Sequence, residues 1–136
     1  MVRITGDYSG GLHCTAHHQP SGNTLATDAP KDNQGRGEAF SPTDLVATAL
    51  GTCIATTMAI VGRKNGFELP PLRFETTKEM STDAPRRIVR LATQLWMPIP
   101  ENHPAAKVLI AAAHGCPVHQ SLHPSVDKPI TFHWAT

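Results

Sequence analysis

A long stretch of nearly uncharged residues predicts the central helix of this protein. Ser41 and Pro42 suit the N-cap and the first helical position, and Asp44 can complete a capping box. Residues compatible with a buried stripe then follow at helical spacing: Leu45, Val46, Ala49, Leu50, Cys53, Ile54, Thr57, Ile60 and Val61. Because the basic pair Arg63 and Lys64 precedes Gly66, we expect the helix to stop there.

A period of two replaces the helical period after Pro70 and Pro71. Apolar or small residues alternate with polar ones from Leu72 to Met80, and the turn residues 81–85 follow. A second alternating run carries Val89, Leu91, Thr93, Leu95 and Met97. These two runs predict an antiparallel hairpin with one face in water.

Shorter elements flank this central part. Residues 1–30 favour short strands and turns, with strands at 12–18 and 24–27, and residues 28–39 form a polar loop without periodicity. A second helix is expected at about 104–114, a short third helix from Pro117, and a last strand through Ile130, Phe132 and Trp134. The predicted order is β-β-β-α-β-β-α-α-β, an α+β fold in a single domain over residues 1–136.

Composition limits the classes of partner. With 136 residues, 40% of them hydrophobic, and a net charge of +1, the chain suits one globular domain and gives no reason to expect nucleic acid or an anionic membrane. Residues 45–62 carry no charge, but their threonines, glycines and alanines make a membrane span a poor interpretation. No apolar signal segment opens the chain, so we expect a cytoplasmic protein.

Three cysteines, Cys14, Cys53 and Cys116, are the main candidates for chemistry. Cys116 lies in a Gly-Cys-Pro break where a helix would begin, and a helix N-terminus lowers the pKa of a thiol. Cys53 lies mid-helix and would need a cation from elsewhere in the fold. Cys53 could equally be a buried apolar residue and Cys116 a small residue at a helix corner, while Cys14 is expected to be inert.

The histidines near Cys116 raise the alternative of a metal site. His114, Cys116, His119 and His123 lie within ten residues, but their spacing matches no established zinc pattern. His119 could instead polarise the Cys116 thiol. No phosphate-binding loop or dinucleotide fingerprint is present. We therefore expect neither a cofactor nor a metal.

Two motifs resemble those of the OsmC/Ohr proteins, the osmotically inducible and organic hydroperoxide resistance family. The first is FSPTDLVATALGTC, residues 40–53, and the second is HGCPVHQSL, residues 114–122. The resemblance implies an intertwined homodimer with two central helices and sheets wrapped around them. It also implies that Cys53 is the peroxidatic cysteine and Cys116 the resolving one. In such a cycle, a hydroperoxide oxidises the first thiol, a disulfide forms, and a dithiol reduces it.

This sequence departs from the family pattern at the groups that activate the thiolate. The best-characterised peroxidases have a Glu directly after the motif proline, where this chain has Thr43, and an Arg that the N-terminal turn at residues 9–12 lacks. The remaining candidates for tuning the thiolate are Arg36, Glu38, Asp44 and His119. The chain resembles a divergent, general OsmC-like branch.

Two functions follow as hypotheses. The first is a thiol-dependent peroxidase that reduces organic hydroperoxides through Cys53 and Cys116. The alternative is a redox-sensing or small-ligand-binding protein without efficient turnover. An apolar pocket would favour alkyl or lipid hydroperoxides over hydrogen peroxide. Its candidate lining residues are Phe40, Leu50, Ile54, Met58 and Trp96.

Overall fold

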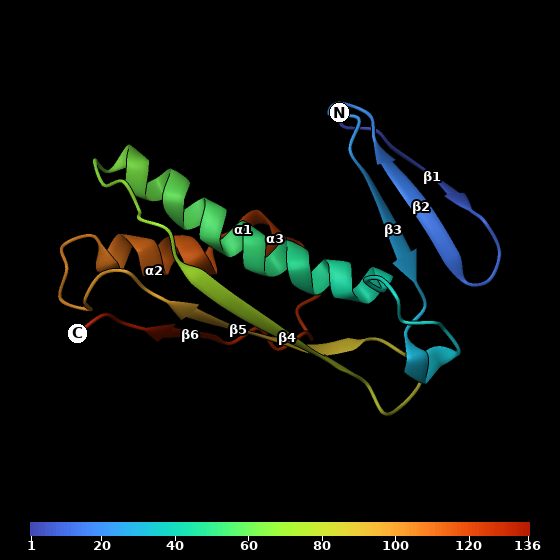
Figure 1. Ribbon diagram of the computed structural model, residues 1–136. Helices are drawn as coiled ribbons and strands as arrows, with labels where there is room; N and C mark the ends of the chain where they lie inside the picture. The colour runs from blue at the N-terminus through green and yellow to red at the C-terminus, as the bar shows by residue number, and fades with distance from the viewer. The chain divides into compact units, whose positions relative to one another are not determined.

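A computed structural model describes residues 1–136, which form two compact units, residues 1–46 and 47–136 (Figure 1). The elements follow the predicted order, with one short 3₁₀ helix added, and the fold is α+β. Their bounds are β1 (Ile4–Tyr8), β2 (His13–His18), β3 (Thr24–Asp28), η1 (Lys31–Asn33), α1 (Pro42–Lys64), β4 (Arg73–Met80), β5 (Ile88–Trp96), α2 (Ala106–His114), α3 (Pro117–Ser121) and β6 (Ile130–His133).

The first unit is an antiparallel sheet in which β2 pairs with both β1 and β3. The register places Ile4, Tyr8, Cys14, Ala16 and Leu25 on one face, because directly opposed residues share a face. Three of these apolar side chains stay exposed in the chain, by 63% at Ile4, 66% at Tyr8 and 45% at Leu25. The sheet therefore has an apolar face that nothing within its own unit covers.

The polar segment after β3 is a well-bonded loop. It contains η1, and the N–H groups of Asn33 and Gly35 both donate to the carbonyl of Pro30. Asp28 is 2% exposed, and its carboxylate accepts bonds from His13 Nδ1 (2.6 Å) and from the backbone N–H of Glu38 (3.1 Å). The hydrogen bond with His13 lowers the pKa of Asp28, and burial opposes it. These bonds tie both ends of the loop to the sheet.

The predicted ends of the central helix are confirmed. The backbone N–H of Ser41 donates to Asp44 Oδ2 (2.9 Å), and the backbone N–H of Asp44 donates to Ser41 Oγ (3.1 Å), which is the reciprocal capping box. At the other end the chain turns at Gly66, whose φ of 76° favours glycine, and the Phe67 N–H bonds to the Gly62 carbonyl. Both boundaries of α1 thus follow from local sequence.

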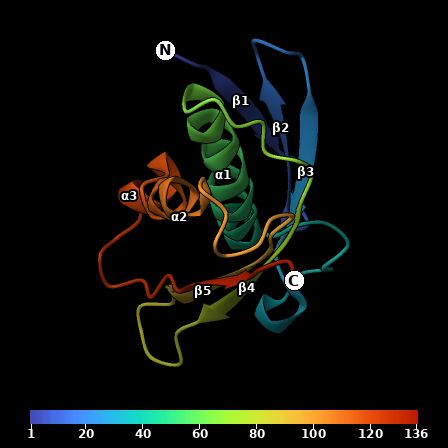
Figure 2. The same cartoon turned by 90° about the vertical axis from the view of Figure 1, so that its left-hand side faces the viewer.

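The second unit has a layer of helices on one face of a sheet (Figure 2). Strands β4 and β5 are antiparallel, and β6 runs parallel to β5. A Cβ on Gly51 of α1 would lie 2.5 Å from the Phe74 ring and 2.7 Å from Thr76 Oγ1, so glycine lets the helix approach β4 closely. The core is mainly apolar and includes Leu50, Ile54, Met58, Leu91, Leu95 and Leu109. The alternating pattern of β5 is confirmed, but the stripe predicted on α1 is only partly right: Leu50 and Ile54 are buried, whereas Ala49 and Ile60 are exposed. The other buried residues of α1 are Ala47, Gly51, Met58 and Gly62.

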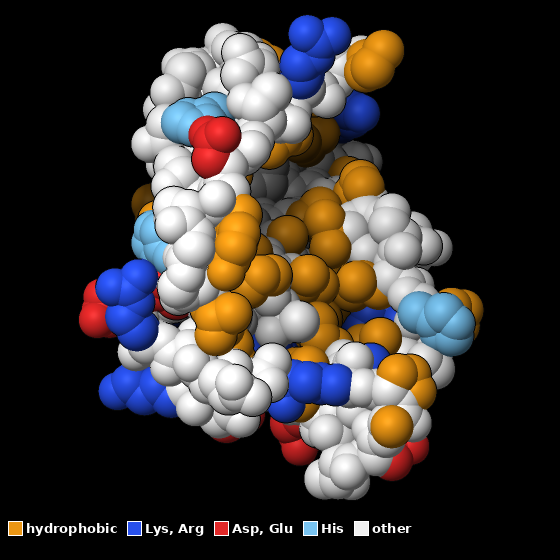
Figure 3. Space-filling model, turned by 90° about the vertical axis from the view of Figure 1, so that its right-hand side faces the viewer, with side chains coloured by type: hydrophobic (Ala, Val, Ile, Leu, Met, Phe, Trp, Pro, Cys, Tyr) orange, Lys and Arg blue, Asp and Glu red, His pale blue; other side chains and the backbone are white.

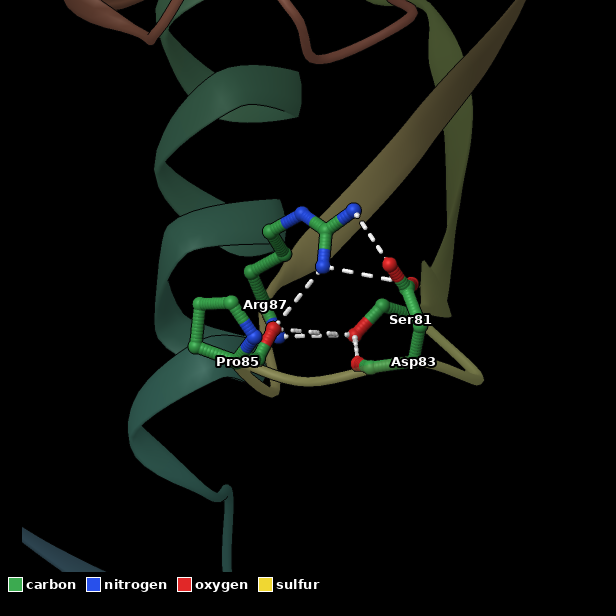
Figure 4. Close-up of polar contacts among 4 residues, drawn as sticks. All are labelled: Ser81, Asp83, Pro85 and Arg87. Carbon is green, nitrogen blue, oxygen red and sulfur yellow. Dashed lines mark hydrogen bonds and ion pairs between the residues drawn. The ribbon is translucent and has the colours of Figure 1, made fainter.

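Polar contacts close the turn between β4 and β5 (Figure 4). The Ser81 hydroxyl donates to the carbonyl of Asp83 (2.9 Å) and accepts the Arg87 backbone N–H (3.1 Å). The Arg87 guanidinium bonds to the Pro85 carbonyl (2.9 Å) and forms an ion pair with Asp83 (3.2 Å). The turn residues predicted at 81–85 therefore form an ordered hairpin tip.

Helix α1 is long and apolar enough to cross a membrane, judged by length and composition alone. Core helices of soluble proteins meet the same criteria. Leu50, Ile54 and Met58 are buried in the second unit, so α1 supplies much of its core. The prediction of a helix enclosed by protein on most sides is wrong in its extent, because only 33% of its apolar window is buried and Thr52, Thr56 and Ile60 are exposed.

Candidate active site

Cys53 lies in the middle of α1 and is partly buried within the second unit. Burial alone would raise the pKa of its thiol. Hydrogen bonding from the Val118 backbone N–H, the Thr57 hydroxyl and the Cys116 thiol outweighs burial and lowers the pKa. Donors stabilise the anionic form of an acceptor, so the site favours Cys53 as a thiolate.

Cys116 is fully buried at the N-cap of α3. Its Sγ accepts the backbone N–H of His119 at 3.4 Å, which is the capping contact expected from the Gly-Cys-Pro break. Burial nevertheless raises the pKa of Cys116, and the neighbouring Cys53 raises it further. The expectation that Cys116 would be the thiol with the lowered pKa is therefore wrong. Desolvation of a fully buried sulfur outweighs the short helix's amide donors.

The pKa values of the two cysteines are thus shifted in opposite directions although the side chains contact one another. With Cys53 ionised, the Cys116 thiol is the donor of the hydrogen bond between them, because a thiolate can only accept. A thiolate is the nucleophilic form of cysteine. Of the two sulfurs, the arrangement therefore favours the anionic form at Cys53 rather than at Cys116.

His119 contributes to this site through its backbone. Its N–H caps Cys116, while its ring makes an edge contact with His114, with centroids 6.1 Å apart. Burial lowers the pKa of His119, as do the charges of Lys128 and His114. No group of three or more His, Cys, Asp or Glu side chains is arranged to hold a metal ion. His114, Cys116, His119 and His123 therefore do not form a metal-binding group.

A cavity of about 430 Å³ lies further along α1. Its lining residues are Thr56, Ala59, Ile60, Arg63 and Lys64. Ile60 is seven residues after Cys53, hence about two turns on and on the same side of the helix. The predicted pocket residues Leu50, Ile54 and Met58 are instead at most 1% exposed. They face the core, so they cannot line an open pocket.

The family of the chain follows from comparison with known proteins. The model of the OsmC-like protein family matches residues 35–129, which include Cys53, Thr57, Cys116 and Val118. This protein belongs to the OsmC-like family. The resemblance inferred from the two cysteine motifs is thereby confirmed. Among curated proteins, none matches the chain.

Solved structures agree with this assignment. A protein of Psychrobacter arcticus 273-4, proposed to act in osmotic stress induced and detoxification responses, is 37% identical and has a TM-score of 0.86, with 97% of this chain and 94% of that chain covered. The organic hydroperoxide resistance protein OsmC of Legionella pneumophila is 18% identical, with a TM-score of 0.79 and coverage of 97% and 96%. OhrB of Bacillus subtilis is 16% identical, with a TM-score of 0.71 and 97% coverage of both chains. The last two show the fold alone.

Three further residues predicted to tune the thiolate lie in the first unit of this OsmC-like protein. The Arg36 guanidinium lies beside Gly11, and Glu38 donates its backbone N–H to Asp28. The Asp44 carboxylate accepts the Ser41 N–H in the capping box. Their action on Cys53 stays a prediction.

Two of the groups that lower the Cys53 pKa were missed in the sequence. Val118 acts through its backbone N–H from a segment 65 positions away, and no residue type predicts such a contact. The sequence pattern places Thr57 only in the apolar stripe of the helix. Its spacing of four residues from Cys53 on one helix was the available signal, because such pairs are neighbours on the helix surface.

Proposed function

We propose that this OsmC-like protein is a cysteine-based peroxidase that reduces organic hydroperoxides in the cytoplasm as part of an antioxidant stress response. Membership of the family supports a role in stress and redox chemistry. A cytoplasmic setting suits the cycle, because thiols are kept reduced there. In this proposal Cys53 is the peroxidatic residue and Cys116 the resolving residue.

The first step oxidises Cys53. The Cys53 thiolate attacks the terminal oxygen of the hydroperoxide, the S–O bond forms and the O–O bond breaks. The displaced alkoxide takes a proton from solvent and leaves as the alcohol, and Cys53 becomes a sulfenic acid. The hydroperoxide is reduced by two electrons and the sulfur is oxidised by two.

The second step forms a disulfide. Cys116 loses its proton and its sulfur attacks the Cys53 sulfur, while the sulfenic oxygen leaves as water. A dithiol reductant then exchanges with the disulfide through a mixed disulfide and returns both cysteines to the reduced state. No cofactor takes part in this cycle.

The observation that carries the proposal is the contact between the two sulfurs, in which the Cys116 thiol donates to Cys53, and the directions of their pKa shifts agree with it. The pKa of Cys53 is lowered by hydrogen bonds despite its burial, whereas burial and the Cys53 charge raise the pKa of Cys116. This difference supports attack by Cys53 and resolution by Cys116. It also supports the order of the steps, because Cys116 loses a neighbouring negative charge once Cys53 is oxidised.

One equivalent of an organic hydroperoxide should therefore convert the reduced protein to a Cys53–Cys116 disulfide within the mixing time of a manual assay. Mass spectrometry of alkylated peptides measures the pairing. Cys53→Ser and Cys116→Ser should each prevent it, and Cys14→Ser is the matched control that should not. If both thiols stay free at the rate of a simple thiol, the peroxidase proposal fails. The redox-sensing or ligand-binding alternative then takes its place.

The cavity along α1 supports an organic substrate. Ala59 and Ile60 give it apolar walls, and the positively charged side chains of Arg63 and Lys64 also line it. Arg63 is already bonded to Glu68 (2.7 Å). An alkyl group attached to the hydroperoxide would gain apolar contact there, which hydrogen peroxide cannot.

We also propose that the protein is a homodimer. Its first sheet exposes Ile4, Tyr8 and Leu25 on one face. Hydrophobic side chains, orange in Figure 3, are exposed at the surface. A two-layer fold needs such a face covered. A second copy of the chain is the occupant that the family resemblance implies.

Light scattering coupled to gel filtration should therefore give twice the chain mass. Tyr8→Lys, on the apolar face of the sheet, should shift the protein towards the monomer. Thr24→Lys is the matched control, because Thr24 pairs with His17 and lies on the other face. A wild-type mass of one chain at micromolar concentration contradicts the dimer.

A further inference from the structure

The Thr57 hydroxyl lies beside the reactive sulfur, with Oγ1 3.7 Å from Cys53 Sγ. Both residues are on α1, one turn apart, so the rigid helix fixes their spacing. Thr57 is half-buried, which limits competition from water for its hydroxyl. The hydroxyl is thus held against the atom that reacts.

Thr52, on the same helix, shows the hydrogen bond that a helical threonine usually makes with the backbone. The Thr52 hydroxyl donates to the carbonyl of Thr48 one turn earlier (2.8 Å) and contacts that of Ala49 (3.2 Å). Such bonds to the preceding turn are what helical threonines ordinarily make. The Thr57 hydroxyl is directed at a sulfur instead. Its O–H is therefore available for the chemistry of Cys53.

We propose that Thr57 is a catalytic residue of the peroxidase reaction, donating its hydroxyl hydrogen to the Cys53 thiolate and stabilising it. The inference rests on the proposed function and adds a residue to it. A thiolate has no hydrogen to give, so the threonine must be the donor once Cys53 is ionised. A hydrogen bond to an ionised acceptor is stronger than one between neutral groups.

The hydrogen bond from Thr57 also determines how the rate of Cys53 oxidation depends on pH. Stabilising the anion increases the fraction of Cys53 that is ionised at a given pH, and it slightly reduces the intrinsic nucleophilicity of each thiolate. Loss of the donor must therefore slow the reaction only where Cys53 is partly protonated. At high pH, where Cys53 is fully ionised, the rate should hold or rise.

The experiment compares Thr57→Val, Thr57→Ser and Thr52→Val, all in a Cys14→Ser background. Absorbance of the thiolate near 240 nm, measured against pH without any hydroperoxide, gives the ionisation midpoint of Cys53. Thr57→Val should move this midpoint up by about one pH unit, a tenfold loss of thiolate at lower pH. Thr57→Ser, which keeps the hydroxyl, should restore the wild-type midpoint. Thr52→Val makes the same chemical change where the hydroxyl bonds to backbone, and should not move it.

Stopped-flow rates of Cys53 oxidation by cumene hydroperoxide complete the test. In Thr57→Val the pH midpoint of the rate should rise with the ionisation midpoint, and the plateau at high pH should not fall. An unchanged ionisation midpoint in folded Thr57→Val overturns the inference. A lower rate at high pH with an unchanged pH midpoint also overturns the inference, because it indicates that Thr57 has only a packing role. The ionisation midpoint of Cys53 is measured without substrate. The effect of Thr57 on it can therefore be determined even if the protein proves not to be a peroxidase.

Discussion

Replacing Cys53 by serine is expected to remove hydroperoxide reduction, with a loss on the order of a thousandfold or more. The serine hydroxyl fits the site but ionises far above neutral pH and cannot form the sulfenic acid on which the cycle depends. Consumption of cumene hydroperoxide in the presence of a dithiol measures the effect. Cys14→Ser, a change at the exposed cysteine of the first sheet, should keep the wild-type rate.

Replacing Cys116 should give a different defect, which separates the two roles. Cys116→Ser should keep oxidation of Cys53 but leave it as a sulfenic acid, which a dimedone adduct on Cys53 would report. Cys116→Ala also removes a donor that lowers the Cys53 pKa, so its rate midpoint should move to higher pH. Turnover that survives Cys53→Ser, or an adduct on Cys116 in the wild type, contradicts this assignment.

Gly51→Val is expected to lower the free energy of unfolding by about 2–3 kcal/mol. The added Cβ would lie 2.5 Å from the Phe74 ring and 2.7 Å from Thr76 Oγ1, so α1 or β4 must shift. Thr76 is bonded to the buried Thr93 (3.0 Å), and a shift there strains that bond as well. Urea denaturation at an unchanged m-value measures the loss.

Ala49→Val is the matched control for that experiment. Ala49 lies two positions earlier on α1 and is exposed, so its change to valine carries only the small cost of a β-branched residue in a helix. A Gly51→Val protein as stable as Ala49→Val would show that the helix and strand are less tightly packed than the distances indicate.

The order and type of the elements could be predicted from the sequence because their causes are local. The Ser41-Pro42-Asp44 box, the stop at Gly66 and the alternation along β4 and β5 each act within a few residues. The second helix begins at Ala106 rather than near Pro104. This difference lies within the one or two residues by which assigned helix ends ordinarily vary. The polar loop at 28–39 was predicted but its ordered conformation was not, because that order comes from hydrogen bonds to the buried Asp28.

The chemistry of the site was predictable only in part. The two cysteines were found from their motifs, but the direction of their pKa shifts was not. The N-cap position of Cys116 is a local feature, whereas its complete burial and the approach of Val118 to Cys53 arise from tertiary packing. The desolvation of a thiol therefore cannot be assigned from its place on a helix.

The hydrogen bonds around Cys53 also bear on the reduction potential of the site. They stabilise a negative sulfur, and a disulfide sulfur carries no such charge, so they favour the reduced pair over the oxidised one. In the proposed cycle, the Val118 and Thr57 donors would therefore make the Cys53–Cys116 disulfide a stronger oxidant and Cys53 a better leaving group when a dithiol attacks. The donors that prepare the thiolate for a hydroperoxide thus also favour its regeneration.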